Sequence, residues 1–265
     1  VPIVTSFQGP TIKPSRNKVS EVYTRIITDL DSAYLLMPAT APAGLPHPAS
    51  SEYIAKYAAK AIEARAYLYK GDYTNARDAA LAVVNSGGYS LVTAANFAGY
   101  WANPAATTNK VETIFELALN TATNNGTAGL DYIYNPAGYG DMLATNDLYN
   151  SYSATDVRRG LIINGTRGGN QAYIVNKYSN VNTATDKDDI KVIRYAEVVL
   201  TLAESYARLG DNINGLIYLN QVAKQRDPSF VGYTSTGSQL ITDILNERRK
   251  ELAFAGFRFF DFNRL

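Results

Sequence analysis

Cysteine is absent from this chain of 265 residues, and histidine occurs once, at His47. Without cysteine the chain has no disulfides, no thiolate metal sites and no cysteine nucleophile. A lone histidine gives little basis for a usual zinc site. No Gly-x-Ser-x-Gly elbow accompanies it, so the sequence does not indicate a Ser-His-Asp hydrolase. We expect His47 to be an exposed loop residue, and we expect no cofactor and no metal.

Charge of either sign is also scarce. Charged residues make up 18% of the chain, below the ~25% typical of soluble domains, and the net charge is +1. With no basic run and no acidic tail, nothing electrostatic favours nucleic acid or anionic lipid. No apolar run approaches the ~18 residues of a membrane-spanning helix. Residues Val1–Thr5 lack the features of a signal peptide, and the missing initiator methionine indicates a fragment or mature form.

Tyrosine is the abundant residue, with 20 copies against 9 phenylalanines and 1 tryptophan. Its flat ring and its hydroxyl suit surfaces that are half exposed to water. We expect most tyrosines to pack between helices and a few to contact a sugar or a peptide. The hydrophobic content of 46% is enough for a substantial core.

Two blocks with helical periodicity, 16–88 and 191–265, flank a middle segment, 89–190, that mostly lacks it. Residues 1–18 contain three prolines and should be extended. The predicted helices run from Lys18 to Pro38, from a Ser50 or Ser51 cap to Gly71, from an Asp72 cap to Gly87–Gly88, from Lys191 to Gly210, from Asp211 to near Pro228, and over about 237–254.

An internal repeat links the two helical blocks. Ala64, Tyr67, Gly71 and Asp72 recur as Ala203, Tyr206, Gly210 and Asp211, at an offset of 139 residues. In each copy one helix ends at Gly-Asp and another begins, as in a tetratricopeptide helix-turn-helix unit. We therefore predict one mainly α domain over 1–265. It is built of tetratricopeptide-like helix pairs, an α-α superhelix, with a long irregular insert containing a few short strands.

The middle segment is rich in Asn, Thr, Gly, Ala and Tyr, and long loops of this kind are often functional. Short strands are predicted at 112–119, 161–163 and 173–175. The glycine-rich stretch 165–170 lies between two of them, which favours a turn over a phosphate cradle. Asp186–Asp189 lacks the glycine and the final glutamate of an EF-hand loop, so we expect a solvated cluster at a helix N-terminus.

Aromatic residues in this segment are the best candidates for ligand contact. Rings stack on the apolar C–H faces of sugars, and Asn, Asp and Arg bond to the hydroxyls. The candidate ligand-binding residues are Trp101, Asn103, Tyr132, Tyr134 and Tyr139, all placed among loop-forming residues. For Trp101 the alternative is burial as a loop anchor. No sequence signature marks a catalytic carboxylate pair, so we predict a protein that is not an enzyme.

The last nineteen residues, 247–265, join a charged helical turn to five phenylalanines spread over nine residues. Glu247, Arg248 and Glu251 have helical spacing and should form surface or interhelical ion pairs. Because burying each phenylalanine is worth ~1.5–3 kcal/mol, the rings should pack on something. We expect a last helix and an exit strand docked on the core by these rings, away from any ligand.

The ordered features together resemble the SusD/RagB-type nutrient-binding proteins. The segments that carry this resemblance are Arg16–Pro38, Ala61–Tyr73, Ile193–Tyr206, Leu219–Arg226 and Glu247–Arg264. The last two are the most specific, and the series covers nearly the whole chain. Family members are usually much longer, which identifies this chain as an excised core or an unusually short member.

The resemblance implies non-catalytic capture of an extracellular nutrient, in the first place a glycan or oligosaccharide. The partner it implies is a SusC-like TonB-dependent outer-membrane transporter. The location is the cell surface of Bacteroidetes, with a lipid anchor expected in the full-length protein and absent from this chain. The alternative is a tetratricopeptide-like protein-protein scaffold that binds no small ligand.

Overall fold

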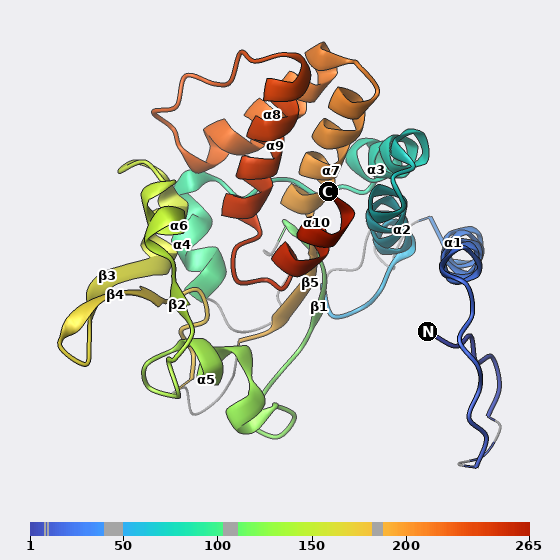
Figure 1. The fold of residues 1–265 in the computed structure, drawn as a ribbon, viewed down its shortest axis with the longest axis horizontal. Helices are drawn as coiled ribbons and strands as arrows, with labels where there is room; N and C mark the ends of the chain where they lie inside the picture. The colour runs from blue at the N-terminus through green and yellow to red at the C-terminus, as the bar shows by residue number, and fades with distance from the viewer. Residues whose placement is uncertain (8, 10, 40–49, 103–110, 182–187) are drawn as a thin grey trace.

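The computed structural model describes residues 1–265 except 8, 10, 40–49, 103–110 and 182–187 (Figure 1). The helices are α1 (Val19–Leu36), α2 (Lys56–Lys70), α3 (Tyr73–Ser86), α4 (Ala94–Ala102), α5 (Leu130–Tyr134), α6 (Asn146–Asn150), α7 (Tyr195–Arg208), α8 (Asn212–Arg226), α9 (Gly237–Glu251) and α10 (Arg258–Arg264). The strands are β1 (Thr113–Leu117), β2 (Leu143–Ala144), β3 (Ile162–Arg167), β4 (Asn170–Val175) and β5 (Ile190–Arg194), and two 3-10 helices are η2 (Gly126–Ala128) and η3 (Val157–Leu161).

Helix α7 is the centre of the fold. Its side chains are nearly all buried, and α3, α8 and α9 each pack against it. Helix α2 pairs with α3, and α1 covers the outer side of α2, so that the helices form a row across the molecule (Figure 1). Alanines at 58, 61, 64, 80 and 203 let these helices approach closely, while leucine, isoleucine and valine side chains fill the space between them.

The predicted repeat is present as two matching helix pairs. Gly71 follows α2 with φ 78° and Gly210 follows α7 with φ 86°, a left-handed conformation that glycine adopts without a Cβ penalty. Asp72 then caps α3 by accepting from the Asn75 amide at 3.3 Å, and Asp211 caps α8 in the same way at 3.0 Å from Asn214. The chain therefore reverses direction through the same glycine-and-aspartate turn at both places.

Replacing Gly210 by Ala should cost about 1 kcal/mol of unfolding free energy, and Gly71→Ala should cost about as much. A Cβ would meet no atom within 4 Å at either position, so the penalty is that of the backbone conformation alone. Urea unfolding measures it. Gly160→Ala is the matched control, because Gly160 has the same open surroundings without a positive φ, and it should change stability by less than about 0.5 kcal/mol. Equal effects at positions 160 and 210 would contradict this reasoning.

Two small antiparallel sheets lie beside the helices. Strands β3 and β4 form a hairpin whose turn is Gly168–Gly169, and β2 pairs with the other side of β4. Both glycines have positive φ, so the glycine-rich stretch is the turn that the sequence predicts. The second sheet pairs β1 with β5, and β5 leads directly into α7. The predicted strands at 112–119, 161–163 and 173–175 are confirmed.

Three sequence-based predictions, two of element boundaries and one of exposure, are wrong for tertiary reasons. Residues 190–194 are strand rather than the start of a helix, because they pair with β1. Ser51 does not cap α2: it is buried, its hydroxyl donates to the Glu116 carboxylate, and the helix starts at Lys56. Asp188 and Asp189 are also buried, where they accept from the Asn180 and Leu119 amides instead of forming a solvated cluster.

The middle segment is more regular than its composition indicates, since α4, α5 and α6 lie within it. The C-terminal segment differs too: residues 258–264 form helix α10 instead of an exit strand. Phe257 is buried as expected, but Phe259, Phe260 and Phe262 are 69%, 53% and 65% exposed. His47 lies outside the described residues, and among those described no helix has the length and hydropathy to cross a bilayer.

Candidate ligand-binding site

A buried cluster of charged side chains underlies the middle segment, which carries the candidate ligand-binding residues. Glu251 of α9 accepts from three arginines: Arg194 of β5 at 2.7 Å, Arg226 of α8 at 3.1 Å and Arg158 of η3 at 3.2 Å. Glu112, just before β1, pairs with Arg194 and Arg226 at 2.8 and 2.7 Å. We call Glu112, Arg158, Arg194, Arg226, Glu247 and Glu251 the charge cluster. It joins the middle segment to both ends of the second helical block.

Within this buried cluster, the positive charges of the arginines balance the negative charges of the glutamates. Burial alone would raise the pKa of Glu251, but the positive charges of Arg226, Arg194 and Arg158 outweigh it and hold that pKa well below its usual range. Glu247 is similarly placed, with Arg158 at 2.6 Å and the Tyr233 hydroxyl donating at 3.0 Å. Arg248 reaches Asp261 of α10 at 3.3 Å, so the predicted interhelical role of Glu247, Arg248 and Glu251 is confirmed, in the core rather than on the surface.

Replacing Glu251 by Gln should cost about 3–5 kcal/mol, because three buried guanidinium groups lose one shared counter-charge. Chemical denaturation followed by circular dichroism measures the loss. The control is Asp29→Asn, which breaks the exposed i,i+4 pair with Arg25 and should cost less than about 1 kcal/mol. A Glu251→Gln loss as small as that of the control would show that the cluster is not a major source of stability.

The tryptophan predicted to contact ligand is buried. Trp101 lies on α4 with 3% of its surface exposed, and its ring meets Tyr100, Phe97 and Tyr178 edge-on at centroid distances of 5.3, 6.4 and 6.2 Å. Three basic side chains lie over the same ring, namely Lys177 at 4.3 Å, Lys191 at 4.9 Å and Arg194 at 5.1 Å. The geometry is that of an anchor, the alternative that the sequence left open.

Lys177, beneath this ring, is an unusual buried amine. Its Nζ donates to the Ala253 carbonyl at 2.6 Å, and the side chain is 2% exposed. Burial, together with the nearby positive charge of Arg194, lowers the pKa of Lys177 well below its usual value. The Lys177 amine therefore loses its proton at a lower pH in the folded protein than in the unfolded chain.

Between the lowered pKa of Lys177 in the folded protein and the normal lysine pKa of about 10.4, the unfolded chain consequently binds more protons than the folded one. We expect the unfolding free energy to rise as the pH increases toward about 10.4, by at most ~1.4 kcal/mol per pH unit for one proton. Lys177→Met should flatten this rise. Urea titrations at several pH values measure both slopes, and an unchanged slope in the variant would refute the assignment.

Two of the predicted tyrosines come together at the surface. The rings of Tyr132, on α5, and Tyr139 are 4.9 Å apart and nearly perpendicular, and Tyr139 is 52% exposed. The Tyr139 amide donates to the Tyr132 carbonyl at 2.8 Å, which closes the loop between them. Gly138 is needed at this turn, because a Cβ there would lie 2.2 Å from the same carbonyl.

A side chain from the β3–β4 hairpin braces this loop from outside. Arg167 Nη2 donates to the Tyr139 carbonyl at 2.7 Å and to the Asp141 carboxylate. We call Tyr132, Tyr139, Asp141 and Arg167 the tyrosine surface. Asp141 and Arg167 were not among the sequence candidates, because their distance along the chain hides their contact. The exposed Tyr139 ring, the half-buried Tyr132 ring and the charged pair supply both an apolar face and hydrogen-bonding groups.

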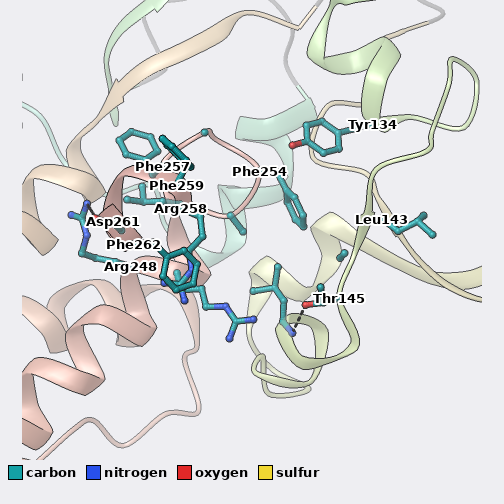
Figure 2. A pocket seen from close by; sticks show the side chains of 16 residues that line it. Tyr134, Leu143, Thr145, Arg248, Phe254, Phe257, Arg258, Phe259, Asp261 and Phe262 are labelled. Atoms are coloured by element: carbon teal, nitrogen blue, oxygen red, sulfur yellow. Dashed lines mark hydrogen bonds and ion pairs between the residues drawn. The ribbon is translucent and has the colours of Figure 1, made fainter. Parts of the chain in front are cut away.

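The remaining candidates lie elsewhere. Tyr134 follows Tyr132 by two residues on α5, about 200° around a helix, and therefore points away from it. Its ring stacks on Tyr178 at 5.8 Å and lines a separate pocket (Figure 2). Asn103 lies outside the described residues. No group of three or more metal-binding side chains occurs within the part of the chain that the structure describes.

Comparison with known proteins places this arrangement in a family. The SusD family profile matches residues 163–265. Two solved structures match almost all of this chain. A SusD superfamily protein from Bacteroides thetaiotaomicron matches with TM-score 0.85 and 28% identity over 100% of this chain. A protein from Bacteroides vulgatus that is named as sugar-binding matches with TM-score 0.83 and 31% identity over 98% of this chain. This chain is a SusD/RagB-type protein. The predicted class, mainly α with tetratricopeptide-like helix pairs, is confirmed.

This SusD/RagB-type chain is shorter than its relatives. It spans 60% of the Bacteroides thetaiotaomicron structure and 57% of the Bacteroides vulgatus structure. A curated SusD-like protein from Formosa agariphila is 32% identical over 101 residues, which are 34% of this chain and 20% of that relative.

Proposed function

We propose that this SusD/RagB-type protein binds a glycan or oligosaccharide through the tyrosine surface. The observation that carries the proposal is the pair of perpendicular rings, Tyr132 and Tyr139, next to the charged pair Asp141 and Arg167. One structural relative is named as a sugar-binding protein, which supports this choice of ligand.

The geometry of the tyrosine surface suits a sugar. Two rings at a right angle offer an apolar corner against which the C–H face of a pyranose packs, and each tyrosine hydroxyl can donate or accept. Asp141 and Arg167 lie at the side of this corner, where they can bond to ring hydroxyls. Because Asp141 is exposed and already paired with the half-buried Arg167, binding requires little burial of unpaired charge. Trp101 and Tyr134 support this surface from within, as buried or half-buried anchors.

The proposed role is capture without catalysis. Asp141 is the carboxylate of the tyrosine surface, and it is already paired with Arg167. Delivery to a SusC-like TonB-dependent transporter, at the outer membrane of a lipid-anchored full-length protein, completes the proposal. The rival function is a scaffold that uses the helix pairs alone, and it predicts that the tyrosine surface has no ligand.

Replacing Tyr132 or Tyr139 by Ala should weaken glycan binding about tenfold each, the value of about 1.4 kcal/mol of stacking. A glycan array identifies the ligand, and isothermal titration calorimetry measures its affinity. Tyr53→Ala is the matched control, because Tyr53 is a 62% exposed tyrosine before α2 and outside the tyrosine surface. It should leave affinity unchanged.

The scaffold function is favoured instead if no glycan binds, or if the control variant weakens binding as much as the two surface variants. Turnover of an oligosaccharide that a single Asp or Glu change abolishes would overturn the non-catalytic role. Circular dichroism of each variant checks that the fold is intact.

A further inference from the structure

A concave site lies apart from the tyrosine surface, between α10, the end of α9 and strand β2. It is a pocket of about 470 Å³, within the range of small-molecule sites (Figure 2). Its lining is mainly apolar, with Leu143, Leu148, Phe254 and Phe262 among the contributors. Thr145 adds a hydroxyl, which already accepts from the Leu148 amide and can still donate to a ligand.

The wall of the pocket is held rigid from behind. Phe254 has φ 63°, the one positive φ of a residue other than glycine in the described parts of the chain. Two buried side chains fix this segment: Lys177 Nζ donates to the Ala253 carbonyl at 2.6 Å, and the Tyr178 hydroxyl donates to the Phe254 carbonyl at 3.0 Å. A strained backbone position that its surroundings hold in place is typical of functional sites, because it preorganises the wall.

One positive charge at the pocket, that of Arg258, has no ion-pair partner among the described residues. Asp261 is occupied by Arg248 at 3.3 Å and Arg264 at 2.8 Å, and Arg249 pairs with the exposed Asp147. Arg258 has no ion-pair partner among the described residues and lies over the Phe262 ring at 4.0 Å. Partial burial and the charge of Arg249 lower the pKa of Arg258.

We propose that this pocket binds a small amphipathic anion, with an aromatic or branched aliphatic body and a carboxylate head. The body packs between Phe254, Phe262 and Leu148, and the carboxylate pairs with the Arg258 guanidinium. A cation is disfavoured because Arg249 and Arg258 would repel it. A sugar is disfavoured because the lining offers few groups for its hydroxyls, so the polar face of the sugar would be desolvated without compensation.

The probe for this site is phenylbutyrate, titrated into the protein by calorimetry, with phenylbutanol and phenylbutylamine as its neutral and cationic counterparts. We expect the anion to bind about tenfold more tightly than the alcohol and the amine to bind most weakly. With methyl-labelled leucine, nuclear magnetic resonance should shift Leu143, Leu148 and Leu252, which line the pocket, and not Leu219 or Leu240 of the core.

Two pairs of variants test the assignment. Arg258→Gln should weaken the anion about tenfold and leave the alcohol unchanged, whereas Arg25→Gln on α1, an exposed arginine, should change neither. Phe262→Ala should weaken both probes. Phe260→Ala should weaken neither, because Phe260 lies on the same helix with similar exposure but does not line the pocket and stacks on Tyr69 instead.

The proposal is overturned if phenylbutyrate does not bind, if the three probes bind equally, or if shifts spread to core leucines. It is independent of glycan capture, since Tyr132→Ala and Tyr139→Ala should leave phenylbutyrate binding unchanged. Loss of glycan binding in those variants with phenylbutyrate binding retained would support two separate sites.

Discussion

The carboxylate of Glu251 connects more of this molecule than any other group described above. Through Arg158, Arg194 and Arg226 it joins α9 to the middle segment, to β5 and to α8. Ion pairs inside a protein gain strength from the low dielectric but must offset the desolvation of every charge. Sharing the carboxylates of Glu112 and Glu251 among three arginines meets that cost and fixes where the middle segment sits.

The rest of the site follows from this placement. The charge cluster holds Arg194 under Trp101, and Trp101 packs against Tyr178. Tyr178 in turn stacks on Tyr134 of α5, the helix that carries Tyr132 on its other side. The Tyr132–Tyr139 ring pair therefore rests on a continuous column of buried and half-buried aromatic and charged groups. Such support is what a binding surface in a loop segment needs to keep its shape.

The same column serves the pocket beside α10. Lys177 and Tyr178 each donate to a carbonyl of the segment Ala253–Phe254, and Phe254 forms a wall of that pocket. The tyrosine surface and the pocket thus share buried supports while presenting different chemistry to solvent. One offers rings with hydroxyls and a paired charge, and the other offers an apolar cavity with an arginine that has no ion-pair partner among the described residues.

The sequence by itself determined the helix pairs, because periodicity, Gly71 and Gly210 as stops, and Asp72 and Asp211 as caps are local properties. It also indicated the β3–β4 hairpin and the family. Only the tertiary structure decided that 190–194 pairs as a strand and that Glu251 is buried among arginines. It also placed Tyr132 with Tyr139 and buried Trp101. These outcomes depend on contacts between residues far apart in the chain, whose energies of desolvation and packing no local pattern records.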